Sequence, residues 1–260
     1  MSFKKNLNKL ISGFGFVIER STPAVLKTDS RLEVDFDFLV RHEIDRLGGV
    51  FSFVEIGAND GDSRGDDFMT YVREFGAKGV MVEPQPDIFS KLKSNCEPHP
   101  GVVPLNKAVH NEKTSMTLYR FNPSMLHDRT DLPQWAKMNG IASFSRQHVL
   151  AHARKLRLNP NVIEELTVDC ITLDDLLAPC DRSPDLLKID VEGYDYEILN
   201  ALDLDCYRPG IIRFENLHMK GPQYQSIVNK LSAAKYRFLA NKKDTTAYFN
   251  RYLDYFKYSP

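Results

Sequence analysis

The sequence predicts an α/β protein with a mostly parallel sheet and helices on both of its faces. Apolar runs typical of buried strands recur at roughly 25-residue intervals, and segments with helical spacing lie between them. A glycine-containing turn follows the first of these runs, and several runs end on an acidic residue. Strands expected at 236–240 and 245–249 flank a turn at 241–244, which predicts an antiparallel hairpin near the C-terminus.

The composition is that of an ordinary globular protein. Of 260 residues, 42% are hydrophobic and 27% are charged, and the formal net charge of −1 argues against a dedicated nucleic-acid binder. Four cysteines without a C-x-x-C pair predict free thiols in a reducing compartment. The apolar stretch 10–18 is too short to span a bilayer. We therefore expect a cytoplasmic protein with no transmembrane segment and no nucleic-acid partner. The sequence does not decide between a monomer and an oligomer.

Two regions are expected along the chain: an N-terminal helical segment over 1–48 and a main domain over 49–260. Helical spacing over 36–47, closed by Gly48 and Gly49, predicts the last helix of the first region. Pro104 lacks an amide hydrogen, which predicts an edge position for its strand. Further strands are expected at 50–56, 79–83, 102–109, 114–121, 165–171, 184–190 and 210–215, and helices at about 63–75, from Asp87, at 172–177, after Asp190 and at about 223–235.

The regular alternation breaks over about 110–165, where we expect an insertion or lid. The polar stretch 122–161 is long for a compact domain, and such segments are often binding lids. Stacking and hydrogen bonds to a polyhydroxylated substrate could come from Trp135, Arg146, His148 and Arg154. A surface excursion with a small core of its own explains the same stretch equally well.

The turn after the first strand has the composition of a nucleotide-binding loop. Gly57 and Gly61 let the chain turn while amides at the next helix start, where Asp62 or Ser63 can be the N-cap, face a ligand. Asn59 adds a polar group, and Glu83 ends the following strand, where an acid can accept both hydroxyls of a ribose. Ordinary turn glycines and a surface glutamate are the simpler interpretation.

An acid inside the first strand, Glu55, indicates which nucleotide is bound. The spacing is Glu-x-Gly-x-x-x-Gly and not the G-x-G-x-x-G of nicotinamide enzymes. A carboxylate repels a pyrophosphate and attracts a free ammonium group, such as the one on S-adenosylmethionine. The loop therefore predicts S-adenosylmethionine, and a nicotinamide oxidoreductase is a weaker alternative.

Five blocks occur in a fixed order, at 53–61 (FVEIGANDG), 82–84 (VEP), 106–109 (NKAV), 172–176 (TLDDL) and 187–193 (LKIDVEG). Together they resemble the FkbM family of S-adenosylmethionine-dependent methyltransferases, over roughly residues 50–250. The resemblance implies the Rossmann-like class I methyltransferase fold, a seven-stranded sheet of order 3-2-1-4-5-7-6. It implies that the cofactor is held by Glu55, Gly57, Asn59, Gly61, Asp62, Glu83, Pro84 and Ala108.

The resemblance also implies which kind of molecule accepts the methyl group. It implies methyl transfer, usually to an oxygen of a sugar or polyketide-type substrate, and it implies that the serine-rich patch 143–145 approaches the active site. The block 214–218 (FENLH) is longer than the acid-x-His pattern of the family, and the insertion is unlike a minimal member.

Acids at two strand ends suggest a metal site. Asp190 ends one strand, and Glu215 with Asn216 ends the next, so both sets are expected at the same edge of a parallel sheet. Carboxylate and amide oxygens suit Mg²⁺, and the set is similar to the Asp…Asp-Asn site of catechol-type O-methyltransferases. The alternative is that Asp190 caps a helix and Glu215 pairs with a cation.

We expect the catalytic groups to be His218, Glu192 and Asp190. His218 titrates near neutrality and could deprotonate an alcohol, although a rim histidine bonded to backbone is an equal alternative. Glu192 could instead be a helix-terminal acid. The favoured function is O-methylation of a hydroxyl on a sugar, glycan or small natural product. An N-methyltransferase and a non-catalytic module that binds S-adenosylmethionine are the alternatives.

Overall fold

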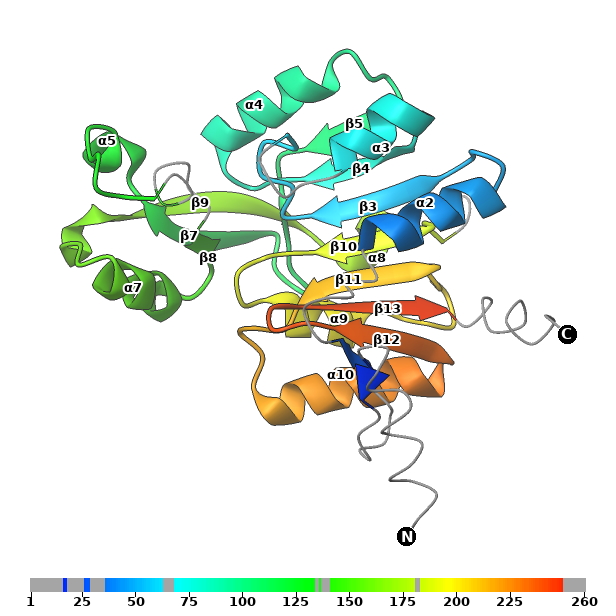
Figure 1. Ribbon diagram of the computed structural model, residues 1–260. Coiled ribbons are helices and arrows are strands. Elements are labelled where there is room, and N and C mark those ends of the chain that lie inside the picture. Colours follow the sequence, from blue (N-terminus) through cyan, green and yellow to red (C-terminus); the bar gives the residue numbers. More distant parts are fainter. Residues whose placement is uncertain are drawn as a thin grey trace, which may run out of the picture.

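The computed structural model describes residues 16–17, 26–28, 36–62, 68–133, 136, 141–180 and 183–249. Within these residues the chain forms a nine-stranded sheet and a separate four-stranded sheet (Figure 1). None of the helices described is both long and apolar enough to cross a lipid bilayer.

The nine-stranded sheet is mixed. Among the described residues its order is β1-β2-β12-β13-β11-β10-β3-β4-β5. Neighbours from β11 to β5 are parallel, whereas β13 is antiparallel to both β11 and β12. The strands are β1 (Phe16–Val17), β2 (Leu26–Thr28), β3 (Ser52–Ile56), β4 (Lys78–Val82), β5 (Val102–Leu105), β10 (Leu186–Ile189), β11 (Ile211–Glu215), β12 (Tyr236–Ala240) and β13 (Asp244–Phe249).

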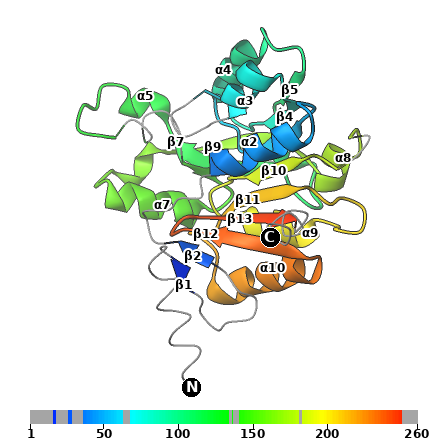
Figure 2. The same ribbon diagram turned by 45° about the vertical axis from the view of Figure 1, so that its right-hand side comes forward.

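Seven of these strands follow the expected order. Numbered along the chain from β3, the run β5-β4-β3-β10-β11-β13-β12 reads 3-2-1-4-5-7-6, and β12 and β13 form the predicted hairpin. Pro104 lies on β5 at the sheet edge, as predicted. The expectation of a seven-stranded sheet is wrong at the opposite edge, where β2 pairs with β12 and β1 pairs with β2 (Figure 2).

The N-terminal segment departs from the helical expectation for the same reason. Its described parts before residue 30 are the strands β1 and β2, and a helix, α2 (Phe36–Arg46), follows. An edge strand such as β12 presents unpaired amide and carbonyl groups, and β2 satisfies part of that row. Helical spacing therefore predicted α2 correctly, whereas the two short strands depend on a partner more than 200 residues away.

Helices cover both faces of the sheet, as expected. Val54 and Ile56 of β3 pack in one apolar cluster with α8 (Leu173–Leu177), α9 (Asp195–Ala201) and α10 (Gly221–Ala233). Phe53 lies in a second cluster with α2, α3 (Phe68–Phe75) and α4 (Pro86–Cys96). Because successive side chains of a strand point to opposite faces, a strand buried on both sides is apolar throughout.

The segment expected as an insertion, about 110–165, supplies β7, β8 and the start of β9 to the four-stranded sheet, whose order is β6-β9-β7-β8 among the described residues. These strands are β6 (Ala108–Val109), β9 (Ile163–Ile171), β7 (Ser115–Phe121) and β8 (Ala142–Ser143), so the strand expected over 102–109 is split between two sheets. The insertion also carries α5 (Pro123–Leu126), α7 (Arg146–Lys155) and the short helix η1 (Pro160–Val162). A small apolar core that includes Phe121 and Val149 holds it together. It projects from one end of the larger sheet in both views (Figures 1 and 2).

Candidate active site

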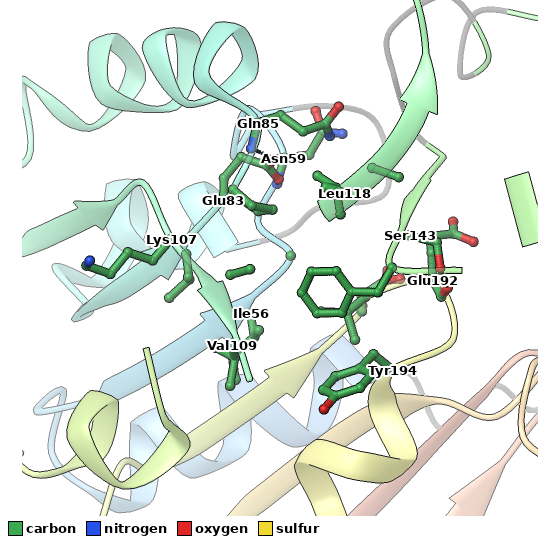
Figure 3. Close-up of a pocket in the computed structure, with 18 of the residues that line it drawn as sticks. Ile56, Asn59, Glu83, Gln85, Lys107, Val109, Leu118, Ser143, Glu192 and Tyr194 are labelled. Carbon is green, nitrogen blue, oxygen red and sulfur yellow. Dashed lines mark hydrogen bonds between the residues drawn. The ribbon is translucent and has the colours of Figure 1, made fainter. Parts of the chain in front are cut away.

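A cavity of about 240 Å³ opens at the carboxyl ends of β3, β4 and β10. Parallel α/β sheets bind ligands at this edge. Across the space, Glu83, Gln85 and Asn59 face Ser143 of the second sheet and also Glu192 and Tyr194, which follow β10 (Figure 3). The lining residues are Ile56, Gly57, Asn59, Val82, Glu83, Pro84, Gln85, Lys107, Ala108, Val109, Leu118, Ala142, Ser143, Phe144, Lys188, Asp190, Val191, Glu192 and Tyr194.

Gly57 is required where it stands. Its φ is +86°, and a Cβ added there would lie 1.8 Å from the backbone oxygen of Asp190. The amide of Gly57 donates to the carbonyl of Val82 at 2.9 Å, and the amide of Asp190 donates to the carbonyl of Ile56 at 2.9 Å. The turn therefore lets the ends of three neighbouring strands approach one another at the floor of the cavity.

Glu83 is a buried carboxylate with two backbone partners. Its Oε2 accepts from the amide of Asn59 at 3.1 Å, and its Oε1 accepts from the amide of Gln85 at 2.8 Å. Burial raises the pKa of Glu83 to about 7, against the opposing effect of its hydrogen bonds with Gln85 and Asn59. The Nδ2 of Asn106 donates to the carbonyl oxygens of Glu83 and Pro84, which fixes the loop that follows β4. The carboxylate of Glu83 is thus held in position to accept hydrogen bonds from hydroxyl groups of a ligand in the cavity.

Five of the eight expected cofactor residues line the cavity: Gly57, Asn59, Glu83, Pro84 and Ala108. Glu55 does not, which corrects the idea that it meets a cofactor ammonium. Glu55 is fully buried opposite Lys188 on the neighbouring strand, and the Lys188 Nζ donates to its Oε1 at 2.7 Å. Because alternate strand residues face opposite sides, the carboxylate points away from the cavity that Ile56 lines.

Gly61 and Asp62 are also absent from the cavity lining, and each has a structural role. A Cβ on Gly61 would lie 2.8 Å from the Cδ1 of Leu92, so this glycine lets α4 pack close to the loop. The Oδ1 of Asp62 accepts from Arg73 at 2.9 Å with its side chain half exposed. Ser63, the other expected helix cap, lies outside the described residues.

A second group of polar side chains borders the cavity beside Glu192. The Oε2 of Glu192 lies 3.1 Å from Nε2 of His148 and 3.6 Å from Nε2 of His218. The backbone oxygen of Glu192 accepts from the hydroxyl of Ser143 at 2.9 Å, so the serine-rich patch does reach the site. Glu192 has a φ of +49°, an uncommon conformation for a residue with a side chain, which aims its carboxylate at both histidines.

The expected catalytic residues therefore gather in one region. Asp190 and Glu192 line the cavity, and His218 lies beside Glu192 and 3.5 Å from Oε2 of Glu215. Burial lowers the pKa of His218, and the neighbouring His148 adds to that effect. Burial raises the pKa of Glu215 to about 9, with further contributions from Glu192 and Asp190.

The magnesium set expected at Asp190, Glu215 and Asn216 gains no support. The Nδ2 of Asn216 donates to the Oγ1 of Thr245 at 2.8 Å, which ties its side chain to β13. Asp190 and Glu215 line a separate cavity of about 150 Å³, and two cations, Lys188 and Arg213, line it as well. Positive side chains in the same small space oppose the binding of a further cation.

Several residues that line the cavity were not predicted from the sequence. Tyr194 stacks on His110 with ring centroids 5.4 Å apart, and Phe144 packs edge-on against Tyr194 at 5.2 Å. Phe144 and Tyr194 form an aromatic wall of the cavity, and His110 lies behind Tyr194 outside the lining. Lys188 could have been found, because a lysine in an apolar strand indicates a buried acidic partner. Of the expected lid residues, Arg146 and Arg154 are exposed on α7, and Trp135 lies outside the described residues.

A family model described as Methyltransferase FkbM domain matches residues 55–238. The chain belongs to this family. The match includes the insertion and ends within β12, so β1 and β2 lie outside the FkbM domain. Family membership supports methyltransferase activity for this chain. A comparison with curated proteins gives no match in sequence.

Solved structures related to the FkbM domain are distant in sequence. Methyltransferase FkbM from Methylobacillus flagellatus KT is 13% identical, with a TM-score of 0.43, and the match covers 77% of this chain and 44% of that one. An O-methyltransferase from Bacillus cereus in complex with SAH is 13% identical, with a TM-score of 0.37 and coverages of 83% and 82%. A SAH-bound Podospora anserina methyltransferase is 11% identical, with a TM-score of 0.40 and coverages of 82% and 76%.

The structure gives a role to several residues of the 187–193 block, LKIDVEG, within the FkbM domain. Lys188 neutralises the buried Glu55, Asp190 closes the turn at Gly57, and Glu192 meets the histidines. Gly193 follows with a φ of +103°, which only glycine adopts without strain. One short sequence thus joins the sheet interior, the cavity floor and the polar group at its rim.

Proposed function

We propose that the chain is an S-adenosylmethionine-dependent O-methyltransferase, with the cofactor in the cavity between the two sheets. The observation that carries this proposal is Glu83, a buried acid at the end of β4 that faces the cavity next to the Gly57 turn. An acid in that position accepts the two hydroxyls of an adenosine ribose. Tyr194 and Phe144 supply aromatic surface for the apolar parts of the cofactor.

The reaction would take place between the cavity and the polar group around Glu192. The acceptor O–H bond breaks, its proton is lost at that group, and the oxygen attacks the sulfonium methyl. A carbon–oxygen bond forms as the carbon–sulfur bond breaks, and its electron pair remains on sulfur. Glu192 borders the cofactor cavity and contacts both His148 and His218, which supports an acceptor site on this side.

The proposed acceptor is a hydroxyl on a sugar, a glycan or a small natural product. Carboxylate and imidazole groups recognise hydroxyls through directional hydrogen bonds, and an oxygen nucleophile needs help to lose its proton, as this side provides. The same fold also supports transfer to nitrogen, so the acceptor is decided by experiment.

The test uses S-adenosylmethionine labelled in its methyl group, the full-length protein and two matched panels of acceptors. One panel contains sugars and polyhydroxylated small molecules, and the other contains amine analogues of the same molecules. We expect label on the hydroxyl panel and much less in Glu83→Ala, whereas His127→Gln, with a largely exposed side chain outside the cavity lining, should match the wild type. Transfer to amines alone would refute O-methylation. Label on neither panel, despite cofactor binding, would favour a non-catalytic module.

A further inference from the structure

Three histidines and one glutamate converge beside the cofactor cavity. His148, His152, Glu192 and His218 each offer one ligand atom, and these four atoms lie within 4.8 Å of one another. In the part of the chain that the structure describes, this is the one group of at least three His, Cys, Asp or Glu side chains found able to hold a metal ion. All four side chains are partly buried, which limits competition from water.

The group is drawn from three separate parts of the chain. His148 and His152 stand one helical turn apart on α7, with ring centroids 4.8 Å apart. Two histidines at this spacing share a face of a helix and can bind one metal ion. Glu192 follows β10 and His218 follows β11, so the insertion and the main sheet each supply two ligands.

The distances suit a tetrahedral ion. Bonds of about 2.0–2.1 Å place the ligand atoms of such a site about 3.3 Å apart. Two pairs already approach this value, at 3.1 Å for His148 with Glu192 and 3.6 Å for His218 with Glu192. The widest pair needs about 1.5 Å of closure, which side-chain rotation supplies. Glu192 brings the negative charge, and its left-handed backbone conformation aims it at the histidines.

We infer that His148, His152, His218 and Glu192 bind a divalent transition-metal ion of the zinc class. Nitrogen ligands favour Zn²⁺ and similar ions over Mg²⁺, which prefers oxygen. This site shares no residue with the magnesium set expected from the sequence. Because Glu192 also borders the cofactor cavity, the ion lies on the proposed acceptor side.

A bound ion would activate the acceptor, a role that rests on the proposed function. It would lower the pKa of a hydroxyl bound to it. Because the four side chains would then be ligands, the proton would pass to water beside them, and the oxygen would attack the methyl group. An ion held by both the insertion and the main sheet also fixes the insertion over the cavity.

Cobalt binding tests the site without any methyl transfer. Metal-free, full-length protein is titrated with Co²⁺, and visible absorption reports four- or five-coordinate ligation. We expect one Co²⁺ per chain, displacement by Zn²⁺, and affinities at least about tenfold weaker in His148→Gln and in His152→Gln. The matched control is His127→Gln, whose histidine side chain is 84% exposed and pairs with Asp128. Equal affinity in His152→Gln and His127→Gln, or no ligand-field band in the wild type, would overturn the site.

Thermal unfolding gives a second measurement, which remains informative for a variant with lower intrinsic stability because it compares the same variant with and without Zn²⁺. Zn²⁺ at a hundredfold excess over its dissociation constant should stabilise the wild type by about 2.7 kcal/mol and the ligand variants far less. No Zn²⁺-dependent stabilisation of the wild type would also overturn the site. Because neither measurement uses a cofactor or an acceptor, failure of the proposed methyl transfer leaves both results intact. Undiminished methyl transfer by metal-free protein that binds Co²⁺ would overturn only the activating role.

Discussion

The ionisation of Glu83 makes the affinity for an adenosine ribose depend on pH. Burial raises the pKa of this carboxyl to about 7, and only its ionised form accepts hydrogen bonds from both ribose hydroxyls. The ionised fraction then rises from about one tenth near pH 6 to about nine tenths near pH 8. A ligand that needs the ionised form should therefore bind about tenfold more tightly near pH 8 than near pH 6.

The assay is calorimetry with 5′-methylthioadenosine, which keeps the ribose and has no group that titrates over this range. In Glu83→Gln the pH dependence should vanish, and the affinity near pH 8 should fall about tenfold to a hundredfold, since hydrogen bonds to a charged group contribute about 1.5–3 kcal/mol. Glu112→Gln, at an exposed position outside the cavity lining, is the matched control and should behave as the wild type. Equal affinities near pH 6 and pH 8 in the wild type would refute this role of Glu83.

Three further predictions concern stability. Lys188→Met leaves the fully buried Glu55 without its 2.7 Å partner and should lower the free energy of unfolding by about 3 kcal/mol, and adding Glu55→Gln should recover at least half of that loss in denaturant titrations. A double variant as unstable as Lys188→Met would contradict this pairing. Gly57→Ala, whose Cβ meets a backbone oxygen at 1.8 Å, should cost about 3 kcal/mol, whereas Gly48→Ala, with a φ of +66° and open space around it, should cost only about 1 kcal/mol. Equal costs would show that the turn at Gly57 can relax. Burial raises the pKa of Asp195 from 3.8 to about 8, so the folded state holds a proton that the unfolded state releases, and stability falls as pH rises between those values by up to about 1.4 kcal/mol per unit. Asp195→Asn keeps the acceptor for the amide of Glu215 and should lose that part of the slope, and an unchanged slope would mean that Asp195 is ionised in the fold.

Local patterns were sufficient to predict most of the fold. Alternating apolar runs, helical spacing and turn residues are properties of neighbouring positions, and they located β3, β4, β10, β11 and the closing hairpin to within a few residues. The order of seven strands came from the family resemblance and matches the structure. The two N-terminal strands were not predicted, because a strand of two or three residues has no hydrophobic pattern of its own. They depend on pairing with a distant strand, since β2 pairs with β12 and β1 pairs with β2.

The site was harder to predict because its contacts are distant in sequence. A glycine-rich turn shows where the chain bends, but the direction of Glu55 depends on strand register opposite Lys188, 133 positions away. The position of Glu83 in the cavity lining was predictable, because an acid directly after a strand lies at the carboxyl edge of a parallel sheet, where ligands bind. His148 and His218 approach Glu192 because of how the insertion packs against the main sheet. The spacing of residues along the chain does not predict that packing.

Calorimetry with S-adenosylhomocysteine and, separately, with NADH tests most directly whether the cavity is a methyl-donor site. We expect S-adenosylhomocysteine to bind once per chain and Gly57→Ala to abolish that binding, because its Cβ would clash at the cavity floor. NADH should give no saturable heat. Tight binding of NADH with none of S-adenosylhomocysteine would contradict the proposed function.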